Sequence, residues 1–169
     1  WVVGDDESDW LVMGLSGEEW QVWPAGPRAL PAPRVSCDPV DSGVWTSVEA
    51  PVSSTKLLRF QINQPETLEI ALPDDFLNFS WTRARRTVDG KLWAYGFFGA
   101  RYLDDLQSTS WQMLDGLPNQ HLSEFIQTEE ALWFLRQSTT GGHSGFSHFA
   151  NGKWTHRHGL PRQLIGLGT

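Results

Sequence analysis

The sequence predicts an all-β domain built from repeated units of about 40–48 residues, and three series of residues support this prediction. The dipeptide Leu-Pro begins at residues 30, 72, 117 and 160, at intervals of 42 to 45 residues. A series of tryptophans follows a similar interval: Trp1, Trp45, Trp93 and Trp133. The third series consists of Trp20, Leu68, Trp111 and Trp154. Because three registers agree, we expect one structural unit to recur along the chain.

Each unit contains four short segments with the character of β-strands. In the last full unit these segments are "NQHLSEFIQTE", "EEALWFL", "SGFSHFA" and "NGKWTHR". They are rich in aromatic residues or alternate in polarity, and turn-forming residues separate them. Asp89-Gly90 and Asn151-Gly152 are dipeptides typical of tight hairpins. No long apolar pattern with a helical period is present, so helix should be nearly absent. Four short strands per unit is the design of a β-propeller blade.

Taken in order, the units predict blade boundaries. Residues 1–31 supply the last three strands of one blade, and residues 32–73, 74–118 and 119–161 supply three full blades of four antiparallel strands. Residues 162–169 would begin the next blade. We favour a partial propeller arc within one domain, because six to eight blades are common. The alternative is a closed four-bladed ring in which "RQLIGLG" pairs with "WVVG".

The chain contains ten tryptophans, which have two interpretations. They can fill the wedges between neighbouring blades, or they can form an exposed surface that stacks on sugars. The packing interpretation is favoured, because each buried tryptophan stabilises a core by a few kcal/mol. Trp23 and Trp81 fall outside the periodic positions and are the better candidates for exposure. Proline after the periodic leucine suits a connection between blades, since proline cannot donate to a central ladder.

Composition excludes several classes of protein. Hydrophobic residues make up 40% of the chain and charged residues 20%, so we expect a folded domain. The net charge of −7 argues against a nucleic-acid partner. No apolar run approaches the roughly 18 residues that span a bilayer, so we expect no direct membrane insertion in this segment. Cys37 is the single cysteine, and no intrachain disulfide is possible.

Residues 72–161 resemble the two-component regulator propeller repeat. Its unit runs from Gly-Leu-Pro through an Asp-Gly turn and a Leu-Trp strand to a final tryptophan. "GLPNQHLSEFIQTEEALWFLRQSTTGGHSGFSHFANGKW" follows this pattern, as does "VDGKLWAYG" at 88–96, whereas residues 32–71 depart from it. The resemblance implies a non-enzymatic sensor module of a signalling protein, in the periplasm or outside the cell. Flanking blades or an output domain would then lie elsewhere in a longer chain.

The ligand face of a propeller carries the connections between blades and the loops between the middle strands. The polar residues that alignment places there are Asp74, Asp75, Asn119, Gln120, His121, Arg136, His143 and Arg162. The candidate ligand-binding set is Asp74, Asp75, Arg83, Asn119, His121, Arg136 and His143. Arg83 lies on an inner strand and can present a guanidinium to an anionic sugar or carboxylate. The alternative is that such arginines pair with acidic residues of neighbouring blades. The expected partner is a small molecule, glycan or protein at the channel mouth.

Metal and catalytic sites are not predicted. His156 and His158 would face the same side of one strand, but that strand is outermost and no third ligand is evident. We therefore expect no metal, no cofactor and no catalytic residue. One alternative function is a glycan-active hydrolase or lyase that uses Arg83 with Asp74 or Glu124. Another is a lectin with one exposed aromatic residue in each blade. The degenerate unit 32–73 favours the sensor, since repeated lectin sites need equivalent blades.

Overall fold

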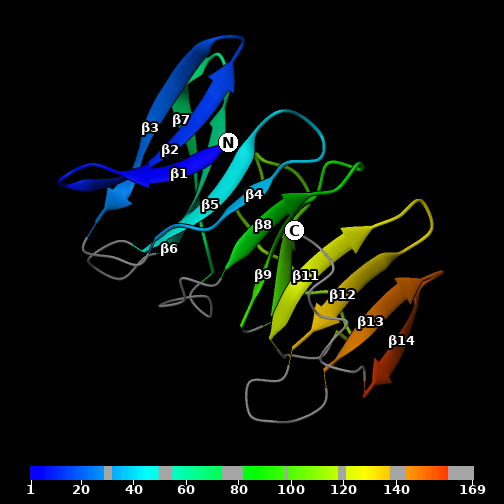
Figure 1. Ribbon diagram of the computed structural model, residues 1–169. Coiled ribbons are helices and arrows are strands. Elements are labelled where there is room, and N and C mark those ends of the chain that lie inside the picture. The colour runs from blue at the N-terminus through cyan, green and yellow to red at the C-terminus, as the bar shows by residue number, and fades with distance from the viewer. Residues whose placement is uncertain are drawn as a thin grey trace.

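The computed structural model describes residues 1–28, 32–49, 55–73, 82–97, 99–117, 121–137 and 144–159. Within these ranges the chain forms β-strands joined by turns, and no helix occurs (Figure 1). The strands form four antiparallel sheets, in each of which sequence neighbours pair. The predicted all-β fold class is therefore confirmed.

The four sheets follow one another along the sequence. The first sheet contains β1 (Val2–Asp5), β2 (Asp9–Ser16) and β3 (Glu19–Pro27). The second sheet contains β4 (Val35–Cys37), β5 (Val44–Glu49), β6 (Thr55–Gln61) and β7 (Gln64–Ala71). The third sheet contains β8 (Arg83–Arg86), β9 (Leu92–Gly96) and β10 (Gly99–Leu103). The fourth sheet contains β11 (Leu122–Gln127), β12 (Leu132–Arg136), β13 (Gly145–Ala150) and β14 (Lys153–His158). Each sheet falls inside one of the four repeat ranges; residues 162–169 lie outside the described residues.

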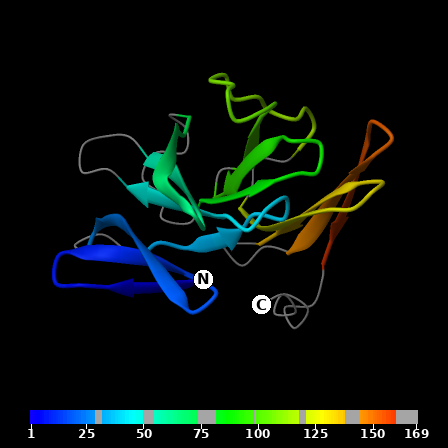
Figure 2. The ribbon, with the colours of Figure 1, turned by 90° about the horizontal axis from the view of Figure 1, so that it is seen from above.

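The sheets are arranged side by side around an open arc (Figure 2). Three hydrophobic clusters hold neighbouring sheets together, and we call these contacts the first, second and third junctions. Trp23 meets Val44 at the first junction, Trp45 meets Leu92 at the second, and Trp93 meets Phe134 at the third. The described part of the chain therefore forms a partial, propeller-like arc. The predicted pairing of "RQLIGLG" with "WVVG" involves residues outside the described part.

At the second and third junctions the recurring tryptophans pack between sheets. Trp45 in β5 and Trp93 in β9 each face the next sheet along the chain and are 0% and 2% exposed. Trp111 and Trp154 face the preceding sheet instead. The indole Nε1 of Trp111 donates to the carbonyl of Ala71 at 2.8 Å, and Trp154 donates to that of Asp115 at 2.6 Å. Indole rings therefore fill the space between neighbouring sheets at these junctions, in agreement with the packing interpretation of the tryptophans.

Trp23 does not have the exposure predicted for it. Its side chain is 5% exposed and contacts the rings of Trp1 and Phe60 at centroid distances of 5.4 and 5.9 Å. Trp23 pairs with Val12 across the sheet, and both side chains lie on the face that meets the second sheet. Alternation along the strand therefore buries Trp23, although its spacing is not periodic. Trp81 lies outside the described residues.

Leu68 is not the equivalent of the outer-strand tryptophans. It pairs with Arg59, which in turn pairs with Trp45, so Leu68 lies on the face that meets the third sheet. Trp111 and Trp154 lie on the opposite faces of their own sheets. The pairing of β6 with β7 shifts in register between Arg59 and Gln61, that is, between Leu68 and the β6–β7 turn. This shift separates Leu68 from the position of the outer-strand tryptophans with which the repeat had aligned it.

The third sheet lacks a regular fourth strand, although the repeat predicts one. Beyond β10 only Tyr102 and Gln112 pair, through backbone hydrogen bonds of 2.9 and 2.8 Å. The carboxylate of Asp105 accepts the backbone N–H groups of Gln107 and Ser108, both at 2.8 Å. This side-chain turn competes with an extended conformation, so the segment reaches the sheet edge at one point.

The inner strands β4, β8 and β11 run in the same sense through the arc. Each begins where the chain crosses from the preceding sheet, and we call this side the entry edge. Each ends in a hairpin turn at the opposite side, the hairpin edge, at residues 38–43, 87–91 and 128–131. The entry edge is the side of the arc to which the sequence analysis assigned the expected ligand.

Candidate functional site

Arg83 begins β8 at the entry edge and reaches toward the fourth sheet. Its Nη1 lies 3.0 Å from Oε2 of Glu124 and 3.1 Å from the carbonyl oxygen of Ser123. The hydroxyl of Tyr95 donates to Oε1 of the same glutamate at 3.2 Å. The side chains of Arg83 and Glu124 are 34% and 32% exposed, so solvent still reaches the pair. The alternative of an arginine paired with a neighbouring blade therefore describes Arg83 in the structure.

Tyr95 supports this pair as a protonated donor. The side chain is 1% exposed, and burial raises its pKa well above the ordinary range, with a further contribution from the charge of Glu124. The phenol therefore keeps its proton at neutral pH and does not supply a phenolate nucleophile. Together, Tyr95, Arg83 and Glu124 form a polar link between the third and fourth sheets at the entry edge.

His121 stands directly before β11 at the same edge. Its ring lies 5.6 Å from the ring of Phe97, measured between centroids. Burial lowers the pKa of His121, and the positive charges of Arg83 and Arg34 lower it further. Arg34 precedes β4, so three successive inner strands carry a basic or imidazole side chain at their starts. We call Arg34, Arg83, His121 and Glu124 the entry-edge cluster.

Arg136 has a structural environment. It is 2% exposed, and its Nη2 donates to the carbonyl oxygens of Arg157 at 2.8 Å and Phe146 at 3.4 Å. These contacts tie β12 to β13 and β14 within one sheet. The other candidate residues Asp74, Asp75, Asn119 and His143 lie outside the described residues, as do Gln120 and Arg162.

The two histidines of β14 contact their own sheet. Nδ1 of His156 lies 2.9 Å from the hydroxyl oxygen of Ser147, and Nδ1 of His158 lies 3.4 Å from Nη2 of Arg136. Burial lowers the pKa of His156, helped by the charges of Arg136 and His158. Across the described ranges, no three side chains of His, Cys, Asp or Glu converge as metal ligands.

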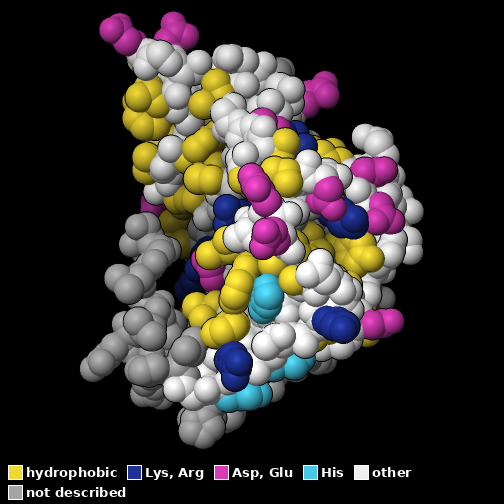
Figure 3. All heavy atoms as spheres, turned by 90° about the vertical axis from the view of Figure 1, so that its right-hand side faces the viewer, with side chains coloured by type: hydrophobic (Ala, Val, Ile, Leu, Met, Phe, Trp, Pro, Cys, Tyr) yellow, Lys and Arg dark blue, Asp and Glu magenta, His cyan; other side chains and the backbone are white. Residues whose placement is uncertain are grey.

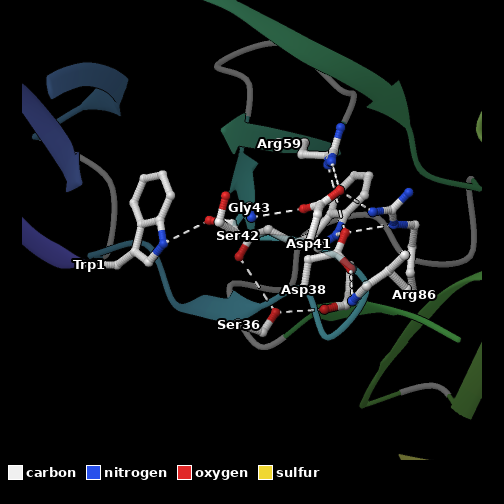
Figure 4. A network of polar contacts seen from close by, with 11 residues as sticks. Trp1, Ser36, Asp38, Asp41, Ser42, Gly43, Arg59 and Arg86 are labelled. Carbon is white, nitrogen blue, oxygen red and sulfur yellow. Dashed lines mark hydrogen bonds and ion pairs between the residues drawn. The ribbon is translucent and has the colours of Figure 1, made fainter. Parts of the chain in front are cut away.

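The hairpin edge of the second junction holds a compact group of charges (Figure 4). We call Asp38, Asp41, Arg59 and Arg86 the ionic cluster. Nε of Arg86 lies 2.7 Å from Oδ2 of Asp38, and Asp41 forms ion pairs with both arginines. The Asp38 side chain is 0% exposed and also accepts the indole N–H of Trp45 at 2.9 Å. Two carboxylates thus balance two guanidinium groups in a nearly dry site.

The third junction has different residues at the equivalent positions. Strand pairing aligns Trp93 with Trp45, and it then places Tyr102 where the second sheet has Arg59. The same alignment puts Thr87 in the place of Asp38 and Gln127 in the place of Arg86. Three charged side chains are therefore replaced by neutral ones.

An open pocket of about 360 Å³ occupies this part of the third junction, and we call it the junction pocket. Its walls come from the hairpin turns of the third and fourth sheets. The lining residues include Asp89, Lys91, Trp93, Tyr102, Leu114, Gln127, Glu129, Glu130, Leu132 and Phe149. Sequence reasoning missed this pocket because it assigned the ligand to the entry edge. Aligning the repeats on Trp45 and Trp93 would have shown the loss of charge.

Comparisons of the chain with protein-family models, with curated proteins and with solved structures returned no match. The resemblance of residues 72–161 to a sensor propeller repeat therefore stays a prediction. In the described ranges there is also no helix with the length and hydropathy needed to cross a membrane.

Proposed function

We propose that the chain is a non-enzymatic binding module belonging to a larger β-propeller, of the sensor type that the resemblance implies. The observation that most supports this function is the pair of sheet faces at the two ends of the arc. Both faces carry exposed apolar side chains, and some of these occupy positions whose equivalents at internal junctions are buried.

The first of these faces belongs to the fourth sheet. Trp133 in β12 takes the strand position of Trp45 and Trp93, but it is only partly buried. Its ring contacts Phe146 and His148 of its own sheet, at centroid distances of 5.3 and 4.1 Å. Ile126, which pairs with Trp133, is 49% exposed. Seen from the side of the fourth sheet, hydrophobic side chains and histidines share the surface (Figure 3).

The second face belongs to the first sheet. Trp20 is 54% exposed and lies on the side of the first sheet that faces away from the second sheet. Trp111 and Trp154 lie on the corresponding side of their own sheets, where the preceding sheet covers them. Val2, Leu15 and Val22 are 46%, 46% and 51% exposed. Monomeric soluble proteins rarely expose contiguous apolar faces. A flanking blade on each side would cover these two end faces, in the same way as neighbouring sheets cover the equivalent faces within the arc.

The ligand in this proposal binds at the entry edge. The Arg83 side chain of the entry-edge cluster is 34% exposed, so an anion such as a carboxylate can approach it from solvent, and guanidinium groups bind such anions with two parallel hydrogen bonds. The ligand would be a carboxylate-bearing small molecule, glycan or protein segment. A sensor of this type would work in the periplasm or outside the cell and pass its signal to an output domain.

Calorimetric titration with uronic acids and dicarboxylates tests the binding function. We expect saturable binding that weakens about tenfold in Arg83→Gln, because one charge-assisted contact is lost. Arg28→Gln is the matched control, since Arg28 pairs with Asp5 on the exposed part of the first sheet. Equal binding by both variants, or no binding by the unmodified chain, would contradict a ligand site at Arg83.

A glycan-active enzyme is the second candidate, because Arg83, Glu124 and Tyr95 are in contact at the entry edge. That function requires release of sugar products from polysaccharides, with the activity abolished in Glu124→Gln. The lectin alternative has less support, since the periodic Trp45 and Trp93 are buried within the arc. Product analysis by chromatography separates the enzyme from the sensor.

A further inference from the structure

The junction pocket and the ionic cluster lie at equivalent places of neighbouring junctions, on the side opposite the entry edge. At the second junction, protein charges fill the space. At the third junction, the space is open and holds about 360 Å³. Cavities of this size commonly accommodate small molecules. The pocket is therefore separate from the entry-edge cluster and does not depend on flanking blades.

A buried donor in the pocket wall lacks a hydrogen-bond partner. Trp93 lines the pocket and is 2% exposed, and its indole nitrogen is bonded to no acceptor in the described part of the chain. The equivalent nitrogen of Trp45 donates to the carboxylate of Asp38. Buried donors are nearly always satisfied, so an unpaired one points to an absent acceptor. An acceptor oxygen on a ligand in the junction pocket would supply the partner that the indole N–H of Trp93 does not have among the described residues.

The charge of the pocket selects the sign of the ligand. Its lining contains three carboxylates, those of Asp89, Glu129 and Glu130, and one cation, Lys91. Lys91 pairs with Asp89 at 3.1 Å. Glu129 and Glu130 are exposed on the turn between β11 and β12 and form no ion pair within the described residues. The rim therefore carries negative charge that a cation can neutralise.

The walls between the rim and Trp93 are apolar. Leu114, Leu132 and Phe149 line them, and the ring of Tyr102 packs on Trp93 with 4.8 Å between centroids. A ligand that spans the pocket thus meets carboxylates first, hydrocarbon next and an N–H donor at Trp93. Few polar groups set among apolar walls are the usual means by which a small-molecule site fixes orientation.

We propose that the junction pocket binds a small organic amine that is protonated at neutral pH and carries an acceptor oxygen beside an apolar group. The ammonium contacts Glu129 and Glu130, the apolar group lies against Leu132 and Phe149, and the oxygen accepts the N–H of Trp93.

L-Leucinamide is the probe for this proposal, because it combines an ammonium, a carbonyl oxygen and a branched alkyl group. We expect it to bind the full chain. Its affinity should fall at high salt, because salt screens the attraction between the ammonium group and the carboxylates of the rim. The neutral analogue 4-methylpentanamide has the same skeleton without the amine and should bind at least about fivefold more weakly. Heteronuclear NMR should show the indole N–H resonance of Trp93 shifting as L-leucinamide is added.

The variant with Glu129→Gln and Glu130→Gln tests the rim, and we expect it to weaken binding about three- to tenfold. The matched control is Glu18→Gln with Glu19→Gln, an adjacent exposed pair at the end of the β2–β3 turn and the start of β3. Trp93→Phe removes the donor, assigns the indole resonance and should weaken binding by a similar factor, with circular dichroism reporting the fold.

Three results would overturn the proposal. The first is the absence of L-leucinamide binding at millimolar concentration. The second is equal affinity for L-leucinamide and 4-methylpentanamide. The third is binding that leaves the Trp93 resonance unmoved and responds equally to both pairs of glutamate substitutions. None of these results bears on the binding of carboxylates at Arg83, so failure here is distinguishable from failure of the proposed sensor function.

Discussion

The second and third junctions join sheets through the same tryptophan position, yet their hairpin edges differ in charge and in filling. At the second junction, Asp38 accepts the indole N–H of Trp45 and pairs with Arg86, so protein groups satisfy one another. At the third junction, Trp93 has similar packing but lies beside an open pocket. The comparison teaches that the repeated apolar wedge holds the sheets together, whereas the non-repeated polar residues decide whether a junction is closed or can take a ligand.

The largest expected effect comes from removing a wedge. Trp45→Ala leaves a cavity among Leu57, Ala84 and Leu92, and we expect it to lower the free energy of unfolding by about 3–5 kcal/mol. Trp133→Ala removes a half-buried ring that no other sheet covers among the described residues, and it should cost about 1–2 kcal/mol. Urea denaturation of both variants measures the difference. If both variants lost the same free energy of unfolding, the distinction between a covered internal face and an uncovered end face would be wrong.

The next effect concerns the ionic cluster. Asp38→Asn leaves Arg59 and Arg86 without their buried carboxylate, and we expect a loss of about 3 kcal/mol in the free energy of unfolding. Thr87→Ala is the equivalent change at the third junction. It removes a hydroxyl that donates to the carbonyl of Lys91 and should cost about 1 kcal/mol. Chemical denaturation compares the two, and a costlier Thr87→Ala would reverse our description of the junctions.

A smaller effect tests how closely the sheets approach at the third junction. Gly116 has a φ of +84°, and a Cβ built there would lie 2.6 Å from Cδ1 of Trp154. We expect Gly116→Ala to cost about 2 kcal/mol, from both backbone strain and overpacking. Gly152→Ala is the control, because its φ is +71° but no atom lies within 4 Å. It should cost about 1 kcal/mol. Identical melting temperatures would argue against tight packing of Trp154.

The smallest effect is a pH dependence at the entry edge. Because burial, Arg83 and Arg34 lower the pKa of His121, the unfolded chain binds a proton at a pH where the folded chain does not. His121 therefore contributes to stability above its ordinary pKa of about 6.5, and this contribution is lost as the pH falls below that value.

NMR titration of the imidazole measures this shift directly. The midpoint of His121 should lie below the ordinary value and move upward in Arg83→Gln, with no change in Arg28→Gln. A midpoint that Arg83→Gln leaves in place would mean that the charge of Arg83 does not lower the pKa of His121, and that the entry-edge cluster is more dispersed than the structure indicates.

The sequence allowed prediction of the sheets but not of all their details. The tryptophan intervals reflect packing between neighbouring sheets, which recurs from unit to unit, and the four sheets fall inside the predicted ranges. Trp23 was misjudged because strand alternation, and not the repeat, buries it. The irregular edge of the third sheet depends on the side-chain turn at Asp105. Competition between a side-chain turn and an extended strand depends on a few local residues, so the spacing of the repeats does not reveal it.

The candidate sites were less predictable for a related reason. Arg83 and His121 could be placed at the entry edge because position along an inner strand follows from the repeat. The sequence named Asp74 and Glu124 as carboxylates that could act with Arg83 but gave no means of choosing between them, since Glu124 lies in the next sheet and beside a register shift. At the junction pocket three neutral residues replace charged ones, Tyr102 on β10, Gln127 on β11 and Thr87 directly after β8, and only the register of the strands brings them to one place.

Hydroxyl-radical footprinting of the tryptophans tests the central claim most directly, because it reads the solvent exposure of each indole in the intact chain. An open arc predicts rapid oxidation of Trp20 and Trp133, and slow oxidation of Trp45 and Trp93. Rapid oxidation of Trp45 and Trp93 would show that the sheets are not wedged together by their indoles. Protection of both Trp20 and Trp133 would show that the two end faces are covered, and would contradict an arc whose ends are open.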